Sequence, residues 1–333
     1  MKKIGILTYW GVPNYGAWVQ AYALNNVIKE MAALTDEVFH IEYLNNIHWN
    51  SYYENDIRLN NAFSYNWAEI EYSKKMTEEE LENTYFDIFI TGSDAIWEFS
   101  IDNMGSDIHL IGNNIEAKKI ASYAASFGET RIEDVDEWVL RGLKKYSKIT
   151  VRDEHSKKIV DELLGHNVAE IVLDPSLLYD FSMDRKVKKP QYNNYIVVYG
   201  IRFNDEFVES VIRYARERKL EIISIGYVNK WCDRSIKMLE LRTFEWLGFI
   251  KYAECVATSM FHGLMVGLSF GKQVKFDQVP YVRNRSQTLL ELLNIEKQVK
   301  DFESMIDYTD VNEKMSDLKE KSVASLKEIL TNE

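Results

Sequence analysis

One histidine stands where a short buried strand turns into a helix. The stretch ECVATSMFHGLMVGLSFGK (254–272) opens with an apolar run typical of a strand, turns through Ser259 to Gly263, and continues as an apolar helix that stops at Gly271. Ligands bind at the carboxyl edge of open α/β sheets, so we expect His262 at such an edge. A histidine there could transfer a proton near neutral pH. It could equally cap the helix or pack in the core, and this stretch alone leaves both roles open.

Three other segments also join a strand end to a helix or turn. Asn14, Tyr15 and Gly16 follow the first strand and open a helix N-terminus, a place that suits anions. Asp94 follows another strand, where it either does chemistry or only caps the next turn. Arg152 leads from a strand into a helix. That setting favours anion recognition, unless the arginine forms a surface ion pair with the acidic residues that follow it.

The elements that must position these residues alternate along the chain. The first half predicts strands at 3–8, 38–44, 86–91, 118–126, 148–152 and 171–173, with helices at 17–31, 133–146 and 154–164. The second half predicts strands at 195–199, 220–225, 255–258 and 273–276, with helices at 205–218, 243–252, 264–270, 286–293 and 311–330. A polar, basic segment at 180–194 is typical of an interdomain linker. The pattern predicts two doubly wound α/β domains, residues 1–182 and 183–333, the second of which includes a C-terminal helix.

Between about residues 45 and 75 the periodicity is lost and aromatic residues accumulate. A segment of this length without regular structure is usually functional or disordered. Its aromatic side chains could stack on sugar rings, or they could pack an irregular lobe: Trp49, Tyr52, Tyr53, Tyr65 and Trp67.

Composition excludes several classes of protein. The 333 residues have a formal net charge of -12, which argues against a nucleic-acid surface. Cys232 and Cys255 have no metal-ligand spacing, and the sequence offers no convincing metal cluster. No run reaches the roughly 18 apolar residues that a membrane-spanning helix requires. The start, MKKIGILTYWG, reads as a first strand rather than a signal peptide, so we expect a cytoplasmic protein.

Several stretches taken together resemble the polysaccharide pyruvyl transferase family. They are NYGAWVQAYAL (14–24), GSDAIW (92–97), SYAASFG (122–128), TVRDE (150–154), VLDPSLL (172–178), TSMFHGLMVGLSFGK (258–272) and VRNRSQTLLELLNI (282–295). The resemblance implies two Rossmann-like domains in a GT-B-like arrangement. It also implies transfer of the enolpyruvyl group of phosphoenolpyruvate onto a sugar as a ketal, with release of phosphate. The histidine of the family's TSMFHG-like turn falls on His262, and the arginine of its VRE-like motif falls on Arg152.

One position departs from the family pattern. Many members carry an arginine two residues before the histidine, where this chain has Met260. We therefore expect other residues to bind the donor beside Arg152 and Ser259. The substitutes for the missing arginine are Arg202, Arg283 and Arg285, in no order.

The implied chemistry agrees with these residue types. A ketal forms from an enol ether after protonation of the methylene carbon, which suits His262 as the acid. The donor's phosphate and carboxylate suit arginine side chains and a helix N-terminus. No redox step and no metal is required, so phosphoenolpyruvate is expected to act as a co-substrate with no further cofactor.

The donor motifs lie mainly in the second half, so we expect the acceptor on the first domain. Asp94 would accept a hydrogen bond or a proton from an acceptor hydroxyl. Asn14, Tyr15, Gly16 and Trp97 would line its site, with an aromatic ring stacked on the sugar. The acceptor would be a sugar of a cell-surface polysaccharide or its lipid-linked precursor, met by transient association with the inner face of the membrane.

Two rival functions remain at this stage. A nucleotide-sugar-dependent GT-B glycosyltransferase would share the fold. An inactive, sugar-binding member of a capsule-assembly system would share it too, and Met260 motivates that alternative.

Overall fold

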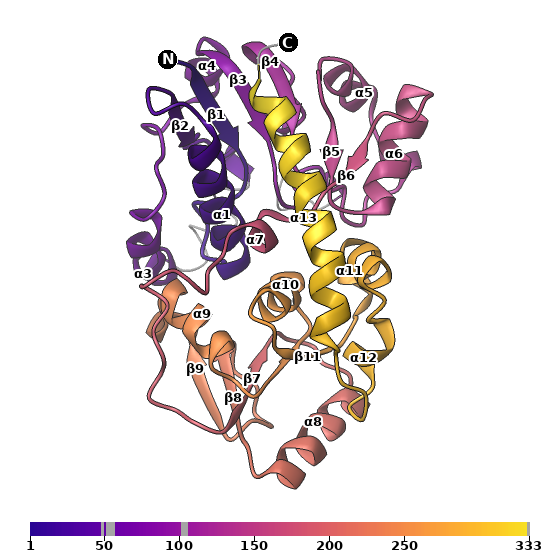
Figure 1. The fold of residues 1–333 in the computed structure, drawn as a ribbon. Coiled ribbons are helices and arrows are strands. Elements are labelled where there is room, and N and C mark those ends of the chain that lie inside the picture. Colours follow the sequence, from indigo (N-terminus) through magenta and orange to yellow (C-terminus); the bar gives the residue numbers. More distant parts are fainter. Residues whose placement is uncertain (48–49, 51–56, 101–105, 332–333) are drawn as a thin grey trace. The chain divides into compact units, whose positions relative to one another are not determined.

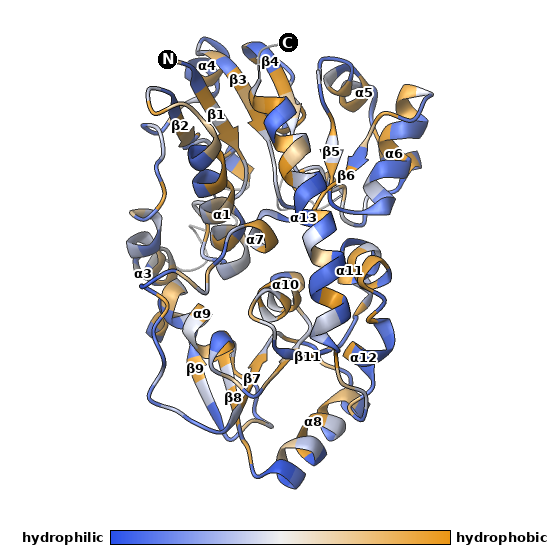
Figure 2. Cartoon of the chain, in the orientation of Figure 1, coloured by the Kyte–Doolittle hydropathy of each residue, from blue (hydrophilic) through white to orange (hydrophobic). Residues whose placement is uncertain are grey.

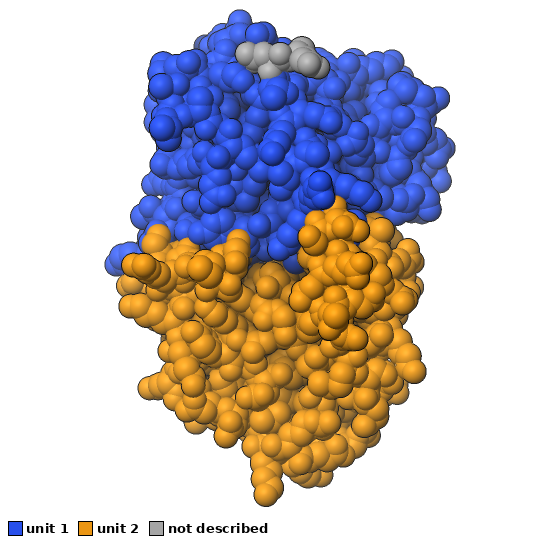
Figure 3. All heavy atoms as spheres, in the orientation of Figure 1, with its two compact units in different colours: residues 1–179, 318–333 blue, residues 180–317 orange. Residues whose placement is uncertain are grey.

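The computed structural model describes all residues except 48–49, 51–56, 101–105 and 332–333 (Figure 1). The chain divides into two compact units (Figure 3). Unit 1 contains Met1–Tyr179 and Leu318–Glu333, and unit 2 contains Asp180–Asp317. No helix in the described part of the chain is both long enough and apolar enough to cross a membrane.

Unit 1 is built on a parallel four-stranded sheet with strand order β2-β1-β3-β4. A parallel pair, β5 and β6, adjoins it through isolated bridges at Lys148 and Val151. The strands are β1 (Lys3–Leu7), β2 (Glu37–His40), β3 (Tyr85–Thr91), β4 (Glu116–Ser122), β5 (Thr150–Val151) and β6 (Glu170–Ile171). The helices are α1 (Tyr15–Met31), α3 (Ile57–Trp67), α4 (Glu78–Glu82), α5 (Glu137–Leu143), α6 (Glu154–Leu164), α7 (Pro175–Leu178) and the 3-10 turn η1 (Ile108–Ile111).

Unit 2 contains a parallel five-stranded sheet with strand order β11-β10-β7-β8-β9. The strands are β7 (Tyr195–Tyr199), β8 (Glu221–Gly226), β9 (Arg234–Lys237), β10 (Cys255–Thr258) and β11 (Gln273–Phe276). The helices are α8 (Asp205–Arg218), α9 (Thr243–Lys251), α10 (Phe261–Ser269), α11 (Pro280–Leu293) and α12 (Glu296–Lys300). Strands β7 and β10 are buried at every position, as expected of parallel strands covered on both faces. Strand β7 appears as an apolar segment in Figure 2.

The last helix, α13 (Tyr308–Leu330), begins in unit 2 and ends in unit 1. Its final turns bury Leu326, Ile329 and Leu330 in the apolar cluster that also contains Ile4 and Ile88. The hydroxyl of Ser322 accepts a hydrogen bond from the Leu173 amide at 2.9 Å. We expected the whole helix in the second domain; its part up to Asp317 belongs to unit 2, and its part from Leu318 onward packs in unit 1.

Several elements differ from the sequence-based expectation. Helix α3 lies within the segment expected to lack regular structure, and β9 had no predicted counterpart. Strand β4 ends at Ser122 rather than at 126. Helix α10 already begins at Phe261, so His262 lies in its first turn and not in the loop before it.

Candidate functional site

In each of the two larger sheets the strand order reverses direction at one place. In unit 1 the chain moves outward from β1 to β2 and returns to place β3 on the other side of β1. In unit 2 it moves from β7 through β8 to β9, then returns to place β10 on the other side of β7. Crevices at such switch points, outside the carboxyl ends of the strands, are the usual ligand sites of open α/β sheets. Most of the expected site residues follow one of these four strand ends.

His262 lies at the switch point of unit 2. It occupies the first turn of α10 directly after β10, and 8% of its surface is exposed. Its ring meets that of Phe261 edge to face, with 5.1 Å between the ring centroids. The first amides of a helix point outward and attract anions. An anion bound at the start of α10 would therefore lie beside the imidazole.

Two hydroxyl groups fix the turn that carries His262. Thr258 Oγ1 donates to the carbonyl of Tyr199 at 2.6 Å and accepts from the Met260 amide at 3.0 Å. The buried Ser259 hydroxyl donates to the carbonyl of Ile201 at 2.9 Å and accepts from its amide at 3.2 Å. These bonds connect the end of β10 to the end of β7. The geometry gives Ser259 a structural role, and its expected contact with the donor stays a prediction.

A glycine after the histidine is required by packing. A Cβ atom on Gly263 would lie 2.2 Å from Thr258 Oγ1. That separation is far below a van der Waals contact, so a larger residue would break the bond that holds the turn. The His-Gly pair thus places the imidazole at the edge while α10 packs closely on β10.

The arginines proposed to replace the one missing at Met260 are not equivalent. Arg202 is exposed in the β7–α8 turn, with φ +55°, directly after the Ile201 backbone that Ser259 binds. The guanidinium of Arg285 lies 5.6 Å from the ring centroid of Tyr281. Tyr281 in turn directs its hydroxyl to Met260 Sδ at 2.8 Å.

Helical spacing separates the two arginines of α11. Residues four apart share a helix face, whereas residues two apart do not. Arg285 therefore lies on the face that Tyr281 presents to Met260, and Arg283 lies on another. This ranks Arg202 and Arg285 above Arg283. Tyr281 was missed in the sequence, although its spacing of four from Arg285 could have indicated it.

The switch point of unit 1 carries a buried polar network. Thr8 Oγ1, after β1, donates to the carbonyl of Ser93 at 2.7 Å. Ser93 Oγ donates to Gln20 Oε1 at 2.6 Å, and Gln20 Nε2 donates to the carbonyl of Tyr9 at 3.1 Å. The polar side chains of this network, which belong to Thr8, Ser93 and Gln20, are almost completely buried. The network fixes the two strand ends against helix α1.

Asp94 projects from this edge and is bound by Arg152. It has φ +80°, a conformation that is strained for a residue with a side chain, and 17% of its side chain is exposed. Arg152 Nη2 donates to Asp94 at 3.1 Å, and Nη1 donates to Asp174 at 2.9 Å. Burial by itself lowers the pKa of the Arg152 guanidinium. The nearby carboxylates have the larger effect and raise this pKa overall: Asp94, Asp174 and Asp153.

Arg152 thus differs from the surface residue that the sequence suggested as one alternative. Its side chain is 1% exposed, and it forms ion pairs with Asp94 and Asp174, which lie far from it in the sequence. Its expected contact with the donor stays a prediction. The geometry favours a role in holding Asp94 at the edge.

The expected acceptor residues are largely internal. Asn14 caps α1, because its Oδ1 accepts from the amides of Gly16 at 2.8 Å and Ala17 at 3.2 Å. Tyr15 and Gly16 are buried. Trp97 is completely buried and donates from Nε1 to the carbonyl of Leu110 at 2.8 Å, so its ring has no face open to a sugar. The expectation that Trp97 stacks on the acceptor is therefore corrected to a role in the core.

A small cavity next to the end of β1 offers other aromatic side chains. It is lined by Thr8, Trp10, Gly11, Glu42, Tyr43, Leu44, Trp67 and Lys75. Its volume of about 40 Å³ has room for a few water molecules at most, so a sugar ring requires movement of its walls. Trp67 was among the aromatic residues expected to meet a sugar, and Trp10 was missed. Tyr65 is mostly exposed, and Trp49, Tyr52 and Tyr53 lie outside the described residues.

Comparison with solved structures identifies the fold. The UDP-GlcNAc 2-epimerase from Neisseria meningitidis bound to UDP-GlcNAc matches with a TM-score of 0.54 and 9% identity, over 100% of this chain and 95% of that one. The UDP-GlcNAc 2-epimerase from Methanocaldococcus jannaschii matches with a TM-score of 0.51 and 12% identity, over 96% and 91%. At these identities the likeness shows the fold alone. It confirms the predicted class of Rossmann-like α/β domains of the GT-B type.

Comparison with protein families shows to which family the chain belongs. No curated protein matches it significantly. The family model for polysaccharide pyruvyl transferases matches residues 14–274, which include Asp94, Arg152 and His262. The chain belongs to the polysaccharide pyruvyl transferase family.

Proposed function

We propose that the chain transfers the enolpyruvyl group of phosphoenolpyruvate to a sugar and forms a pyruvate ketal. The observation that carries this proposal is the position of His262 in the first turn of α10, at the switch point of a family member's second sheet. A proton donor and an anion-attracting helix end lie together there. Phosphoenolpyruvate requires both, because it is the phosphate ester of an enol and also carries a carboxylate.

The reaction balances without a redox partner. His262 gives a proton to the methylene carbon, which becomes a methyl group and leaves an oxocarbenium-like carbon. One sugar hydroxyl attacks that carbon, the carbon–oxygen bond to phosphate breaks, and a second hydroxyl closes the ring. The two sugar hydroxyl groups release two protons. One restores the proton that His262 gave up, and the other goes to the departing phosphate. The proposed chemistry therefore requires phosphoenolpyruvate as a co-substrate and no cofactor.

On this proposal the donor's anionic groups bind to unit 2. The start of α10 receives one of them. Arg285 supplies positive charge beside Tyr281, which contacts Met260, the position where many family members have an arginine. Arg202 supplies positive charge in the β7–α8 turn. Arginine suits this role because it makes two-point contacts with phosphate or carboxylate.

The acceptor binds to unit 1 on the same proposal. Asp94 has a partly exposed carboxylate at the switch point and is suited to accept a proton from a sugar hydroxyl. Trp10 and Trp67 supply aromatic surface near Thr8. The acceptor we propose is a sugar of a cell-surface polysaccharide or its lipid-linked precursor, reached in the cytoplasm or at the membrane's inner face.

Titration calorimetry with phosphoenolpyruvate, UDP and GDP tests the donor. Binding of phosphoenolpyruvate alone supports the proposal. Binding of a nucleoside diphosphate alone would replace it with a nucleotide-sugar glycosyltransferase. Phosphate release is then measured against a panel of sugars and lipid-linked sugars. Donor binding with no phosphate release on any acceptor would favour an inactive, sugar-binding member of a capsule-assembly system.

The proton donor is tested with His262→Ala and His262→Gln. General acid catalysis contributes about a hundred- to ten-thousand-fold, so both variants should lose most turnover while they keep donor affinity. The amide of Gln can form a hydrogen bond but cannot deliver a proton. His166→Ala, at an exposed histidine after α6, is the matched control and should be fully active. Parental turnover in His262→Gln would refute the assignment.

A further inference from the structure

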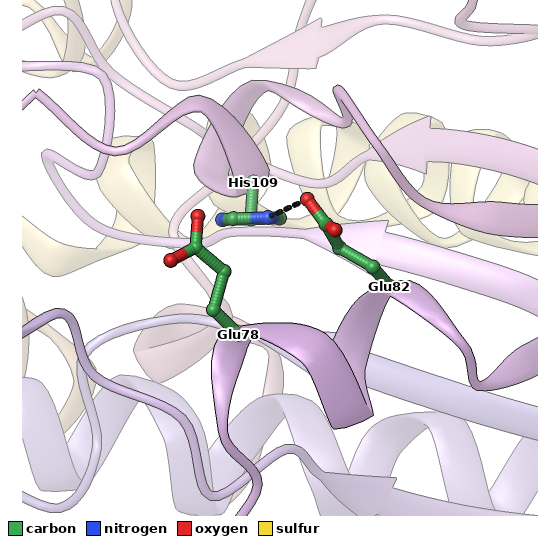
Figure 4. A group of neighbouring side chains, drawn as sticks. All are labelled: Glu78, Glu82 and His109. Carbon is green, nitrogen blue, oxygen red and sulfur yellow. Dashed lines mark hydrogen bonds and ion pairs between the residues drawn. The ribbon is translucent and has the colours of Figure 1, made fainter.

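A histidine and two glutamates converge in unit 1 on elements that the proposed reaction does not use. Glu78 and Glu82 lie one turn apart on α4, and His109 lies in η1 (Figure 4). One oxygen or nitrogen atom from each residue lies within 4.8 Å of the others. His109 Nε2 is 3.1 Å from Glu82 Oε1. Figure 4 shows both carboxylates directed toward the imidazole ring.

The other ring nitrogen of His109 is already engaged. Nδ1 lies 2.7 Å from Asp107 Oδ1, and the same oxygen accepts from the His109 amide at 2.9 Å. The side chains of His109 and Asp107 are 1% and 4% exposed. In many metal sites a carboxylate on one nitrogen of a histidine orients the ring so that the other nitrogen can bind the ion. This is the usual arrangement behind histidines that bind metal ions.

The charges around His109 favour a divalent cation. Three carboxylates surround the ring: Glu78, Glu82 and Asp107. A divalent cation bound between these carboxylates would offset most of their combined negative charge. Asn114 Nδ2 donates to Glu82 Oε1 at 2.7 Å and so holds one carboxylate in place.

We propose that Glu78, Glu82 and His109 bind one Zn²⁺ ion. The ligands are His109 Nε2 and one oxygen from each glutamate, with water in the fourth position, and Asp107 and Asn114 orient the ligands from behind. Zn–N and Zn–O bonds of about 2.0–2.2 Å bring tetrahedral ligand atoms to about 3.4 Å from one another. Glu78 is exposed and can rotate to close the remaining distance. The imidazole ligand favours Zn²⁺ over Mg²⁺, which prefers oxygen.

The site would join two segments on either side of β3 in the sequence. Helix α4 precedes β3, and η1 follows it. The zinc ion links them and leaves the proposed ketal chemistry untouched. Phosphate release from phosphoenolpyruvate therefore does not bear on this inference.

The experiment uses the full chain, freed of any affinity tag, treated with EDTA and dialysed. Titration calorimetry with ZnCl₂ should give one equivalent per chain. Glu78→Gln removes an exposed ligand with little effect on the fold and should weaken binding at least about tenfold. Glu79→Gln makes the same charge change on the neighbouring exposed residue of α4 and should bind Zn²⁺ as the parent does.

Hydrogen exchange locates the ion. Zn²⁺ should slow exchange at residues 77–83 and 107–112 in the parent and in Glu79→Gln, but not in Glu78→Gln. Three results would overturn the proposal. They are no stoichiometric binding by the parent, equal binding by the two variants, or protection confined to other segments.

Discussion

Arg152→Met should destabilise unit 1, because methionine has similar length but leaves two carboxylates behind without their cation. The guanidinium and Asp174 are each 1% exposed and 2.9 Å apart, while Asp94 is 17% exposed. Removing one partner of a buried ion pair costs about 3–5 kcal/mol. Asp174 keeps two donors from Ser176, its amide at 3.0 Å and its hydroxyl at 2.6 Å. Since Asp94 is also partly solvated, we expect the lower end, about 3 kcal/mol.

Hydrogen exchange of the amides in β3 and β5 is the assay, because it reports opening of unit 1 without assuming that both units unfold together. A loss of about 3 kcal/mol corresponds to an opening constant raised about 150-fold. Adding Asp174→Asn to Arg152→Met removes one uncompensated charge and should recover part of this loss. Asp174→Asn alone should be destabilising. Arg141→Met, at an exposed arginine of α5, is the control.

An opening free energy of Arg152→Met within about 1.4 kcal/mol of the control, which corresponds to about tenfold in exchange rate, would refute this reasoning. So would an unchanged loss after Asp174→Asn is added. Weakened phosphoenolpyruvate binding in a variant of parental stability would instead make Arg152 a donor ligand.

Three further predictions follow from the geometry of the two units. Arg285→Ala should weaken phosphoenolpyruvate binding at least about tenfold in a calorimetric titration, while Arg213→Ala on α8 should not, because removing a charge from a bound anion costs upward of about 2 kcal/mol. Asp94→Asn should raise the acceptor concentration needed for phosphate release and leave donor affinity unchanged; the reverse pattern would contradict the assignment of unit 1 to the acceptor. Burial lowers the pKa of His40 to about 4, so the unfolded chain takes up its proton first as pH falls below about 6.5. The opening free energy of β2 should then fall by about 2 kcal/mol between pH 7.5 and 5.0 in hydrogen exchange, and His40→Gln should lack this part of the pH dependence.

Local patterns predicted the elements whose ends are set by neighbouring residues. The bounds of α6, β7, α8 and β10 agree with the sequence-based expectation, since a cap or an apolar run determines each of them. Helix α3 was missed because its apolar residues lack a clear period, and tertiary packing of Phe63 supports it instead. The order of strands across a sheet leaves no such local trace. The sequence could therefore place His262 at a strand end without showing that this strand forms a switch point.

The partners of the charged residues could not be predicted from local sequence. Arg152 meets Asp174 and Asp94 across 22 and 58 positions of the chain. His109 meets Glu82 across 27 positions, and no spacing rule for metal ligands covers such a gap. Trp97 lies in a motif shared with the family but points into the core. Residue type and strand-end position identify candidates for a site, whereas burial decides which of them can touch a ligand.

The discontinuous course of unit 1 affects how the chain folds during synthesis. Domains generally fold as units while the N-terminal part of a chain leaves the ribosome first. Here the first 179 residues emerge without Leu326, Ile329 and Leu330, which cover part of the apolar face that contains Ile4 and Ile88. Unit 2 is complete before that face is closed. An apolar surface of unit 1 therefore stays exposed until the last turns of α13 are synthesised. During that interval the surface is prone to aggregation and accessible to a chaperone.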